Sequence, residues 1–500
     1  MLNTPEVPIN LLALNKIGAI SKWLDLTASP LEIKNALNEH NCKIMVCLDI
    51  LLPKVAPIIS NTNVKHNLIV SPADSLSTVQ KIGYKLKNKL TGKEIDIPED
   101  KKFIPFYEFV DQYSTPETIK GVSFDKDKPS IIIQSSGTTG IPKSIVHTDY
   151  GVGKFIEKIA YSDLPLYPKE KLLVVVPPFL AYGLIDSIIL AYAFGMVAEL
   201  YPKVDPDALY KNLGNFTMSF AAPLHCRYLA ERIDEIRKKD LEKIKCLISG
   251  GDKITKEELI ELEQILGIKI LNGYGNNEGL GAITFNPYNA NKHGTVGIPK
   301  YGDTVTIRDL GNNEELKNGE IGEVCYKTET TFKEYTNKEE ETLRVKRKHQ
   351  DGSVWVHTND LGSMDEEGYL ILDGRIQRVI IRTAFKISPS TIETVVEKHP
   401  AVKECIAVGV PDLQEDNVPL LFYVIKEKYL SDKIKIESEI RALCENSLKE
   451  AAIPKYYYNI DEIPYTDNNK QDYRKLEQLG LMYVGENSFD NLALKKIKNN

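Results

Sequence analysis

Hydrophobic and polar positions divide this chain of 500 residues into two kinds of segment. Short apolar runs predict buried strands, and apolar residues that recur at helical spacing predict amphipathic helices. The strand-like runs are 43–50, 131–134, 172–176 and 244–249, with further ones between 380 and 425. The helical patterns are 224–239, 256–266 and 433–449. Because strands alternate with helices along the chain, we expect an α/β organisation.

One stretch could be mistaken for a membrane helix, because residues 172–200 are nearly free of charge and long enough to span a bilayer. However, Pro177 and Pro178 interrupt it after a strand-like start, and Asp186 lies in its helical second half. This pattern favours buried segments of a globular domain, and we expect no membrane span.

Composition narrows the class of protein. A chain of this length with 42% hydrophobic residues can bury large cores and normally divides into domains. The net charge of −7 offers no general attraction to nucleic acid or to anionic membranes. The seven cysteines form no C-x-x-C pair, which suits a reducing compartment without structural zinc. The first residues lack the regions of a signal peptide, so we expect a cytoplasmic protein with no nucleic-acid partner.

The most informative segment is 131–148, IIIQSSGTTGIPKSIVHT, where a predicted strand runs into a loop of hydroxyl and glycine residues. Such loops bring backbone N–H groups and hydroxyls close to phosphate oxygens, and Lys143 adds a positive charge. The loop differs from the common nucleoside-triphosphate loop, because Pro142 stands where that motif needs glycine. An ordinary turn is the alternative for an isolated segment of this kind.

Four further segments follow in order: NGYGNNEG (272–279), WVHTNDLGSMDEEG (355–368), DGRIQRVIIRTAFKISPSTIE (373–393) and IPYTDNNKQDYRKL (463–476). Together with the loop, they resemble the motifs of the adenylate-forming superfamily, which includes acyl- and aryl-CoA synthetases. The resemblance runs from Asn3 to about Leu476, and its wording is most similar to that of benzoate-type CoA ligases. A dinucleotide fingerprint is the rival interpretation of 272–279, but its last glycine falls one place late.

The resemblance implies an α/β architecture of two domains. We expect a large N-terminal domain of stacked β-sheets and helices at 1–373, short at its N-terminus. A hinge at 374–377 and a small mobile α+β domain at 378–500 should follow it.

The resemblance also implies a set of ATP-binding residues. Glu278 would hold Mg²⁺, Asp360 would accept the ribose hydroxyls, and Arg375 would reach ribose or phosphate. The expected catalytic residues are Lys470, Glu278, Thr138 and Thr139. The expected ATP- and AMP-binding residues are Ser135, Ser136, Gly137, Thr138, Thr139, Gly140, Lys143, Gly273, Tyr274, Gly275, Asn276, Asn277, Asp360, Arg375 and Lys470.

The acid pocket is expected around PFLAYGL (178–184). Amino-acid-activating relatives usually place an aspartate in this region, whereas this chain has Leu180, Ala181 and Tyr182 there. A buried ammonium group without a counter-charge is costly, so an α-amino acid is disfavoured unless another carboxylate reaches in. An aryl acid stacked on Tyr182 is favoured, and a short or medium aliphatic acid is the alternative. The expected pocket residues are Ala181, Tyr182, Gly183, Ser249, Gly250 and Gly251.

Several residues depart from the family pattern. Ser144, Asn277 and Asn359 replace residues near the nucleotide, and Asn469 replaces the glycine before Lys470. The thiol channel and hinge are expected at Gln377, Ala384 and Phe385. There Gln377 replaces an acidic or basic residue, and Ala384 replaces a glycine beside which the pantetheine arm passes. These two changes bear on the second half-reaction.

We therefore expect an ATP-dependent acid–thiol ligase that uses ATP, Mg²⁺ and CoA or a carrier-protein phosphopantetheine. It would form an acyl adenylate from a small-molecule carboxylic acid and then transfer the acyl group to the thiol. The alternatives are an enzyme that stops at the adenylate or loads a carrier protein, and a nucleotide-binding relative that has lost catalysis.

Overall fold

The computed structural model describes residues 1–487 except 72, 75, 77, 91–94, 114–118, 135–142, 204, 379, 383–384, 413–415, 449–451 and 466–470. Contacts divide the chain into two compact units. Unit 1 comprises Met1–Val305, Tyr326–His357 and Glu367–Leu370, and unit 2 comprises Thr306–Cys325, Thr358–Glu366 and Ile371–Asn500. The domain limits expected from the sequence, 1–373 and 378–500, stay a prediction.

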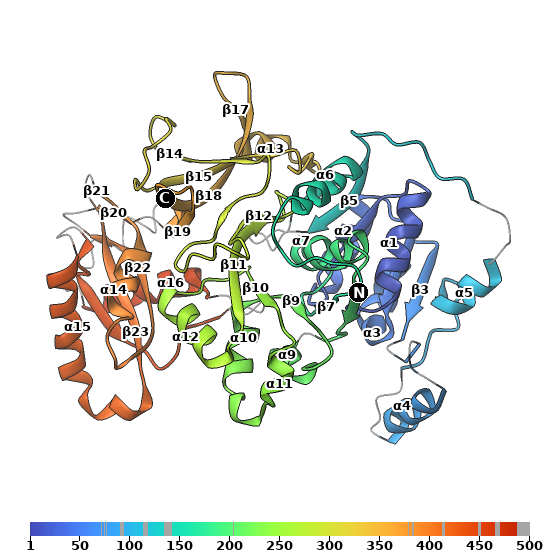
Figure 1. Cartoon of the computed structure of the whole chain (residues 1–500), viewed down its shortest axis with the longest axis horizontal. Helices are drawn as coiled ribbons and strands as arrows, with labels where there is room; N and C mark the ends of the chain where they lie inside the picture. Colours follow the sequence, from blue (N-terminus) through green and yellow to red (C-terminus); the bar gives the residue numbers. More distant parts are fainter. Residues whose placement is uncertain are drawn as a thin grey trace. The chain divides into compact units, whose positions relative to one another are not determined.

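The largest sheet of unit 1 has seven strands in the order β13-β12-β11-β10-β9-β7-β8 (Figure 1). Its strands are β7 (Lys171–Val174), β8 (Val197–Leu200), β9 (Met218–Ala221), β10 (Cys246–Ser249), β11 (Lys269–Asn276), β12 (Gly281–Phe285) and β13 (Ile298–Pro299). The strands β7, β8, β9, β10 and β11 pair in parallel, whereas β12 and β13 run antiparallel. The carboxyl ends of the parallel strands therefore lie along one edge of the sheet.

Alternation along the parallel strands sends side chains into a core on each face of this sheet. Cys246 and Ile248 of β10 belong to one core, which α6 and the segment 181–193 cover. Leu247 belongs to the other core, which α10 and α12 cover. The helices are α6 (Asp149–Ala160), α7 (Ala181–Gly183), the π-helical segment η2 (Leu184–Ile189), α8 (Leu190–Ala193), α9 (Ala208–Lys211), α10 (Pro223–Ala230), η3 (Ile233–Glu235), α11 (Lys238–Leu241) and α12 (Lys256–Leu266).

Unit 1 also contains two smaller sheets, one with the order β1-β5-β6-β16 and one with the order β2-β3-β4. Their strands are β1 (Ser21–Trp23), β2 (Ile44–Leu48), β3 (His66–Val70), β4 (Phe103–Pro105), β5 (Pro129–Gln134), β6 (Ser144–Thr148) and β16 (Glu334–Tyr335). Strand β17 (Lys346–Lys348) pairs with the start of β18. The remaining helices are α1 (Glu6–Lys16), α2 (Pro30–Glu39), η1 (Asp49–Leu51), α3 (Leu52–Ile59), α4 (Thr78–Leu90), α5 (Phe106–Tyr113) and α13 (Glu339–Val345).

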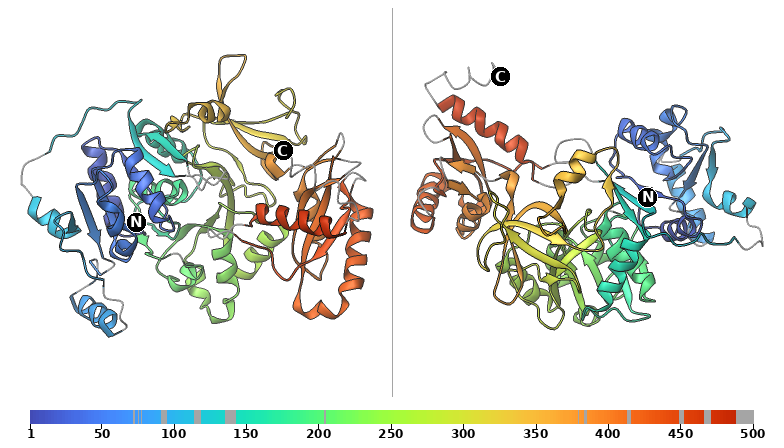
Figure 2. Two further views of the ribbon diagram at one scale, coloured as in Figure 1. Left: turned by 180° about the vertical axis from the view of Figure 1, so that it is seen from behind. Right: turned by 90° about the horizontal axis from the view of Figure 1, so that it is seen from above.

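Unit 2 contains a sheet of order β21-β20-β23-β22, with β24 beside β23. Helices α14 and α15 cover one face and α16 covers the other (Figure 2), so neighbouring residues of β22, such as Ala407 and Val408, enter different cores. Its elements are η4 (Ile376–Arg378), β20 (Ile380–Arg382), β21 (Phe385–Ile387), α14 (Pro389–Val396), β22 (Val402–Asp412), β23 (Asp416–Ile425), η5 (Glu427–Asp432), α15 (Lys433–Ser447), β24 (Tyr456–Asn459) and α16 (Tyr473–Asn487). Four further strands each have residues in both units: β14 (Thr304–Arg308), β15 (Gly322–Lys327), β18 (Val354–Met364) and β19 (Leu370–Arg375). They form a sheet of order β14-β15-β18-β17, with β19 beside β18.

The helix expected at 224–239 is broken in the structure. Helix α10 ends at Ala230, a short 3-10 turn follows, and Ile236 is extended before α11 begins at Lys238. Ile233 and Ile236 still pack against the core beside α10 and α12. Their apolar spacing was correctly interpreted as burial, but a chain that bends around the core produces it here instead of one continuous helix.

The segment 172–200 forms β7, α7, η2, α8 and β8. None of the helices that the structure describes is both long enough and apolar enough to cross a bilayer.

The hairpin of β11 and β12 leads to a testable prediction about Gly275. A bulge lies between Tyr274 and Gly275, and a Cβ on Gly275 would overlap the backbone of Gly281. We expect Gly275→Ala to lower the free energy of unfolding by about 1–3 kcal/mol, because neither strand can move aside without breaking the pairing. Gly153→Ala is the control, since a Cβ there meets open space in α6. Equal urea midpoints for the two variants would contradict this account.

Candidate nucleotide and acid site

The site in unit 1 is built on the carboxyl ends of β7, β9, β10 and β11. In open sheets with parallel strands, ligands bind at this edge, where loops leave neighbouring strands. The predicted pocket segments Ala181–Gly183 and 249–251 follow β7 and β10, and the predicted nucleotide motif 272–279 begins in β11. The fold thus brings three of the predicted segments, far apart in sequence, to one edge of the sheet.

Tyr182 fixes the wall of the expected acid pocket. Its hydroxyl lies 3.1 Å from the carbonyl oxygen of Ala221 and 2.9 Å from that of Ile248, at the ends of β9 and β10. Burial raises the pKa of Tyr182 well above its usual value, so the hydroxyl keeps its proton and acts as a donor. Its ring meets that of Phe220 edge to face, with the centroids 5.9 Å apart.

Two glycines and a serine follow β10 beside this tyrosine. A Cβ on Gly250 would lie 3.5 Å from the ring of Tyr182 and 3.5 Å from the carbonyl oxygen of Gly273, so a side chain there would touch both. Ser249 is fully buried, and its hydroxyl has no hydrogen-bond partner among the described residues. A buried hydroxyl of this kind suits a polar group of a ligand at the strand end.

The nucleotide motif forms a β-hairpin, which excludes the rival dinucleotide interpretation. That fingerprint needs a helix after its glycines, whereas here β12 follows the turn at once. The Asn276 side chain organises the turn, since its Oδ1 accepts hydrogen bonds from the N–H of Gly279 (2.8 Å) and the hydroxyl of Tyr326 (2.9 Å). The hairpin thereby places Glu278 at the start of the return to β12.

Tyr335 connects Glu278 with Lys143, the lysine of the predicted phosphate loop. The Tyr335 hydroxyl donates a hydrogen bond to Glu278 Oε1 (2.8 Å), and the Lys143 ammonium lies over the Tyr335 ring, 4.9 Å from its centroid. Lys143 also pairs with Glu341 of α13, with 2.6 Å between Nζ and Oε2. The hydrogen bond from Lys143 lowers the pKa of Glu341. Tyr335 and Glu341 were missed in the sequence, because neither belongs to a motif.

Asn277 connects this array with the segment expected to line the acid pocket. Its Oδ1 accepts a hydrogen bond from the N–H of Ala181 (3.1 Å), and its carbonyl oxygen accepts one from Nε2 of His147 (2.8 Å). Burial lowers the pKa of His147 to about 3, so the ring stays neutral and Nε2 carries its proton. The residue that departs from the family pattern therefore has a definite structural task.

A buried aspartate and a buried lysine hold β12 in place. Asp186 of η2 accepts a hydrogen bond from the N–H of Ala282 (3.1 Å), while Lys300 donates to the carbonyl oxygen of the same residue. Lys300 also pairs with Asp303, with 3.2 Å between Nζ and Oδ2. Burial raises the pKa of Asp186 to about 7 and lowers that of Lys300. A Cβ on Gly281, where φ is 113°, would overlap the Asp186 carboxyl, so this contact requires glycine.

Unit 2 brings together two residues that are predicted to bind the nucleotide. Arg375 at the end of β19 pairs with Asp360 of β18, with 3.0 Å between Nε and Oδ1. Asn359 has a φ of 58°, a left-handed conformation that glycine adopts freely and asparagine tolerates better than most residues. The departure at this position therefore keeps the backbone geometry that a glycine would give.

Other predicted residues lie outside the described part of the chain: Ser135, Ser136, Gly137, Thr138, Thr139, Gly140, Ala384 and Lys470. Gln377 lies in η4 and Phe385 at the start of β21, and only their backbones are described. The roles of all these residues, and of the predicted site as a whole, stay predictions.

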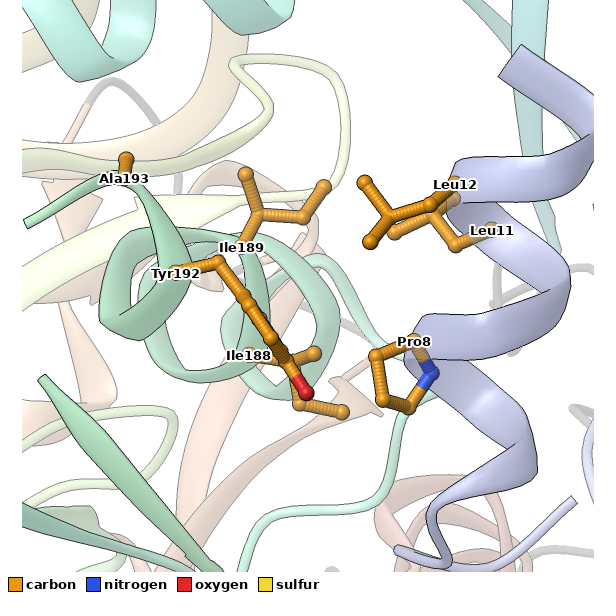
Figure 3. A pocket seen from close by; sticks show the side chains of 7 residues that line it. All are labelled: Pro8, Leu11, Leu12, Ile188, Ile189, Tyr192 and Ala193. Atoms are coloured by element: carbon orange, nitrogen blue, oxygen red, sulfur yellow. The ribbon is translucent and has the colours of Figure 1, made fainter. Parts of the chain in front are cut away.

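The described residues also form an apolar pocket of about 280 Å³ away from these motifs (Figure 3). Side chains of α1, η2 and α8 line it: Pro8, Leu11, Leu12, Ile188, Ile189, Tyr192 and Ala193. None of the predicted site residues is among them.

Comparison with known proteins assigns the chain to a family. Residues 1–336 match the family model of AMP-binding enzymes, and residues 391–470 match that of the AMP-binding enzyme C-terminal domain. The chain belongs to the AMP-binding enzyme family. The expectations of an adenylate-forming superfamily member, of a mixed α/β fold and of an enzyme of the AMP-forming acyl-CoA ligase type are thereby confirmed.

Individual relatives differ in the acid that their names give. The long-chain-fatty-acid–CoA ligase of Bacillus subtilis (strain 168) is 28% identical over 479 residues, which cover 95% of this chain and 83% of the relative. The benzoate CoA ligase from Burkholderia xenovorans LB400 has a TM-score of 0.77 at 20% identity, covering 95% of this chain and 88% of that one. ATP-bound MatB from Rhodopseudomonas palustris has a TM-score of 0.79 at 20% identity, covering 96% and 87%. At these identities the solved structures establish the fold.

The array around Glu278 leads to a testable prediction about ATP binding. Tyr335→Phe removes one hydrogen bond to a carboxylate, so we expect the affinity for ATP with Mg²⁺ to fall roughly tenfold or more, measured by titration calorimetry. Tyr161→Phe is the control, because that exposed tyrosine stacks on Tyr301 with centroids 4.2 Å apart. An unchanged affinity in Tyr335→Phe would show that Glu278 does not depend on this bond.

The contacts at the start of β6 lead to a testable prediction about Glu39. Ser144, which follows Lys143, donates a hydrogen bond to Glu39 of α2 (2.6 Å), and Lys22 donates another (2.7 Å). Burial acts to raise the pKa of Glu39, but hydrogen bonds from His40, Lys22 and Ser144 outweigh it and lower the pKa to about 2.

Because the pKa of Glu39 is lower in the folded state, its ionised carboxylate stabilises the fold. This contribution to the free energy of unfolding is present above pH 4.5 and is lost as pH falls toward 2. We therefore expect the difference in urea midpoint between wild type and Glu39→Gln to shrink over that range. Glu257→Gln, which removes an exposed carboxylate of α12, is the control for charge loss alone. A difference for Glu39→Gln that stays constant with pH would contradict the assignment.

Proposed function

We propose that this protein uses ATP to convert a carboxylic acid to an acyl adenylate and then transfers the acyl group to the thiol of coenzyme A. The observation that supports this most is the connected array of Lys143, Tyr335 and Glu278 beside the pocket segment that Asn277 binds. It gathers in unit 1 a cation, the carboxylate expected to bind Mg²⁺ and the expected wall of the acid pocket. A reaction between a carboxylate and a polyphosphate needs all three, because two anions must approach each other.

The two half-reactions balance as follows. A carboxylate oxygen of the acid attacks the α-phosphorus of ATP, an acyl–phosphate bond forms, and pyrophosphate leaves. The thiol sulfur then attacks the acyl carbonyl, the thiol proton is released, and AMP leaves. Negative charge grows on the phosphoryl oxygens in the first step, and Lys143, Lys470 and the hydroxyls of Thr138 and Thr139 would stabilise it.

The donor set fits a magnesium ion bound jointly with ATP. Mg²⁺ is usually held by one or two carboxylates together with phosphate oxygens and water, and Glu278 supplies one carboxylate whose orientation Tyr335 fixes. When bound, the ion neutralises phosphate charge. Asp360 and Arg375, paired in unit 2, would take the ribose hydroxyls and a neighbouring oxygen of the nucleotide.

We favour an aryl acid as the substrate. Tyr182, in the segment after β7, and Phe220 of β9 bring two aromatic rings edge to face near this edge of the sheet, and Ala181 is small and buried. Asp186, the carboxyl group that follows this segment, accepts a hydrogen bond from the N–H of Ala282 and lies against Gly281. Because burial raises its pKa to about 7, it is a weak counter-charge for an α-ammonium group. The name of the B. subtilis relative makes a fatty acid the second candidate.

The proposal is tested by acid-dependent AMP release from ATP. The panel contains benzoates, hydroxybenzoates, short, medium and long fatty acids and amino acids, each with and without CoA. We expect AMP and an acyl-CoA with the aryl acids. Acyl adenylate without a thioester would move the proposal to an enzyme that loads another acceptor, such as a carrier protein. No AMP with any acid would support a non-catalytic nucleotide-binding protein.

Lys470→Ala separates catalysis from binding. We expect adenylate formation to fall on the order of a hundredfold to a thousandfold while ATP binding survives. Lys475→Ala, which removes an exposed lysine of α16 close by in sequence, should leave the rate unchanged. Equal rates for both variants would remove Lys470 from the mechanism.

A further inference from the structure

Helix α4 carries an apolar stripe that points away from the protein. Val79, Ile82, Leu86 and Leu90 are three or four residues apart, so they share one side of the helix. Their exposed fractions are 81%, 57%, 56% and 85%. A Cβ on Gly83, which lies next to the stripe, would meet no atom within 4 Å. In Figure 1 and the left view of Figure 2, α4 lies apart from the strands of the sheet β2-β3-β4.

The opposite side of α4 is the less exposed one. Lys81, Tyr84 and Asn88 are half-buried and also lie three or four residues apart. Burial raises the pKa of Asp74, and the charge of Lys81 counteracts this shift, so Lys81 lies near the chain before the helix. This orientation is the reverse of that of an ordinary surface helix, which turns its apolar stripe to the core and its polar side to water.

The charges of α4 identify what can cover the stripe. The helix contains four lysines and no acidic residue, although the whole chain has a net charge of −7. Lys87 and Lys89 are exposed and lie on the two flanks of the stripe. Long lysine side chains beside an apolar stripe can extend to anionic headgroups while the stripe enters the interface. Nucleic acid would satisfy the lysines but leave the apolar residues in water.

We propose that α4 is an interfacial helix that docks this protein on an anionic membrane surface, with the apolar stripe in the headgroup region. The attraction to anionic lipid comes from the lysines of this one helix. The net charge of the whole chain is negative and does not contribute to it. The inference is independent of which acid the enzyme activates, because α4 contains none of the predicted site residues.

The test is sedimentation of the full chain with vesicles. Phosphatidylcholine vesicles are compared with vesicles that also contain phosphatidylglycerol, at low and at high salt. We expect binding only to the anionic vesicles, weakened by salt because exposed charges are screened. Leu86→Gln should lower the partition coefficient roughly tenfold, and Lys87→Gln with Lys89→Gln roughly thirtyfold.

Ile434→Gln is the matched control, since Ile434 is 88% exposed in α15, between two lysines. It should leave binding unchanged. All the substituted side chains are exposed, so the variants should keep the wild-type circular dichroism spectrum.

Three results would overturn the proposal. The first is no binding to anionic vesicles, and the second is binding that the α4 variants retain. The third is a dimer in solution that Leu86→Gln dissociates, because a second copy of the chain would then be what covers the stripe.

Discussion

The hydrogen bonds of Tyr182 and Asn277 hold the candidate site together. Each spans a long separation in sequence: Tyr182 reaches the ends of β9 and β10, and the Asn277 side chain reaches the N–H of Ala181. The segment after β7 is thereby fixed against three other chain segments at the carboxyl edge of the sheet. A polar group that lost such a bond in this buried setting would stay without a partner, so the arrangement is defined to within small movements.

The rigidity of this edge extends to the carboxylate of Glu278. Asp186 and Lys300 bind the N–H and the carbonyl oxygen of Ala282 from two sides, and Asn276 fixes the turn before it. Glu278 therefore lies in the turn of a hairpin whose two strands are both anchored, and the Tyr335 hydroxyl orients the Glu278 side chain. A site that must place a carboxylate beside a polyphosphate gains from such support, because small displacements of charged groups weaken their interaction.

Much of the scaffold could be predicted because its signals are local. The helix at 256–266 begins after Thr255, whose side chain accepts from the N–H of Glu258, and ends at Gly267 in a left-handed conformation. The motif residues Glu278, Asp360 and Arg375 could be selected by resemblance, and the structure pairs two of them. Their roles in binding nucleotide remain predictions.

The rest depends on contacts that leave no pattern in the sequence. Tyr335 lies 57 positions from Glu278, and Glu341 lies still further along the chain from Lys143. Asp186 was interpreted only as a charge that argues against a membrane helix, whereas it anchors β12. The break after Ala230 escaped prediction because Ile233 and Ile236 keep an apolar spacing while the backbone bends. In each case tertiary packing decides what local propensity leaves open.

We propose that ATP meets the acid at the array around Glu278. Acid-dependent exchange of labelled pyrophosphate into ATP measures the first half-reaction alone, and Glu278→Gln changes the carboxylate with little change in shape. We expect exchange that requires an acid in the wild type and falls on the order of a hundredfold or more in Glu278→Gln. Exchange that persists undiminished in Glu278→Gln would place the chemistry elsewhere in the molecule.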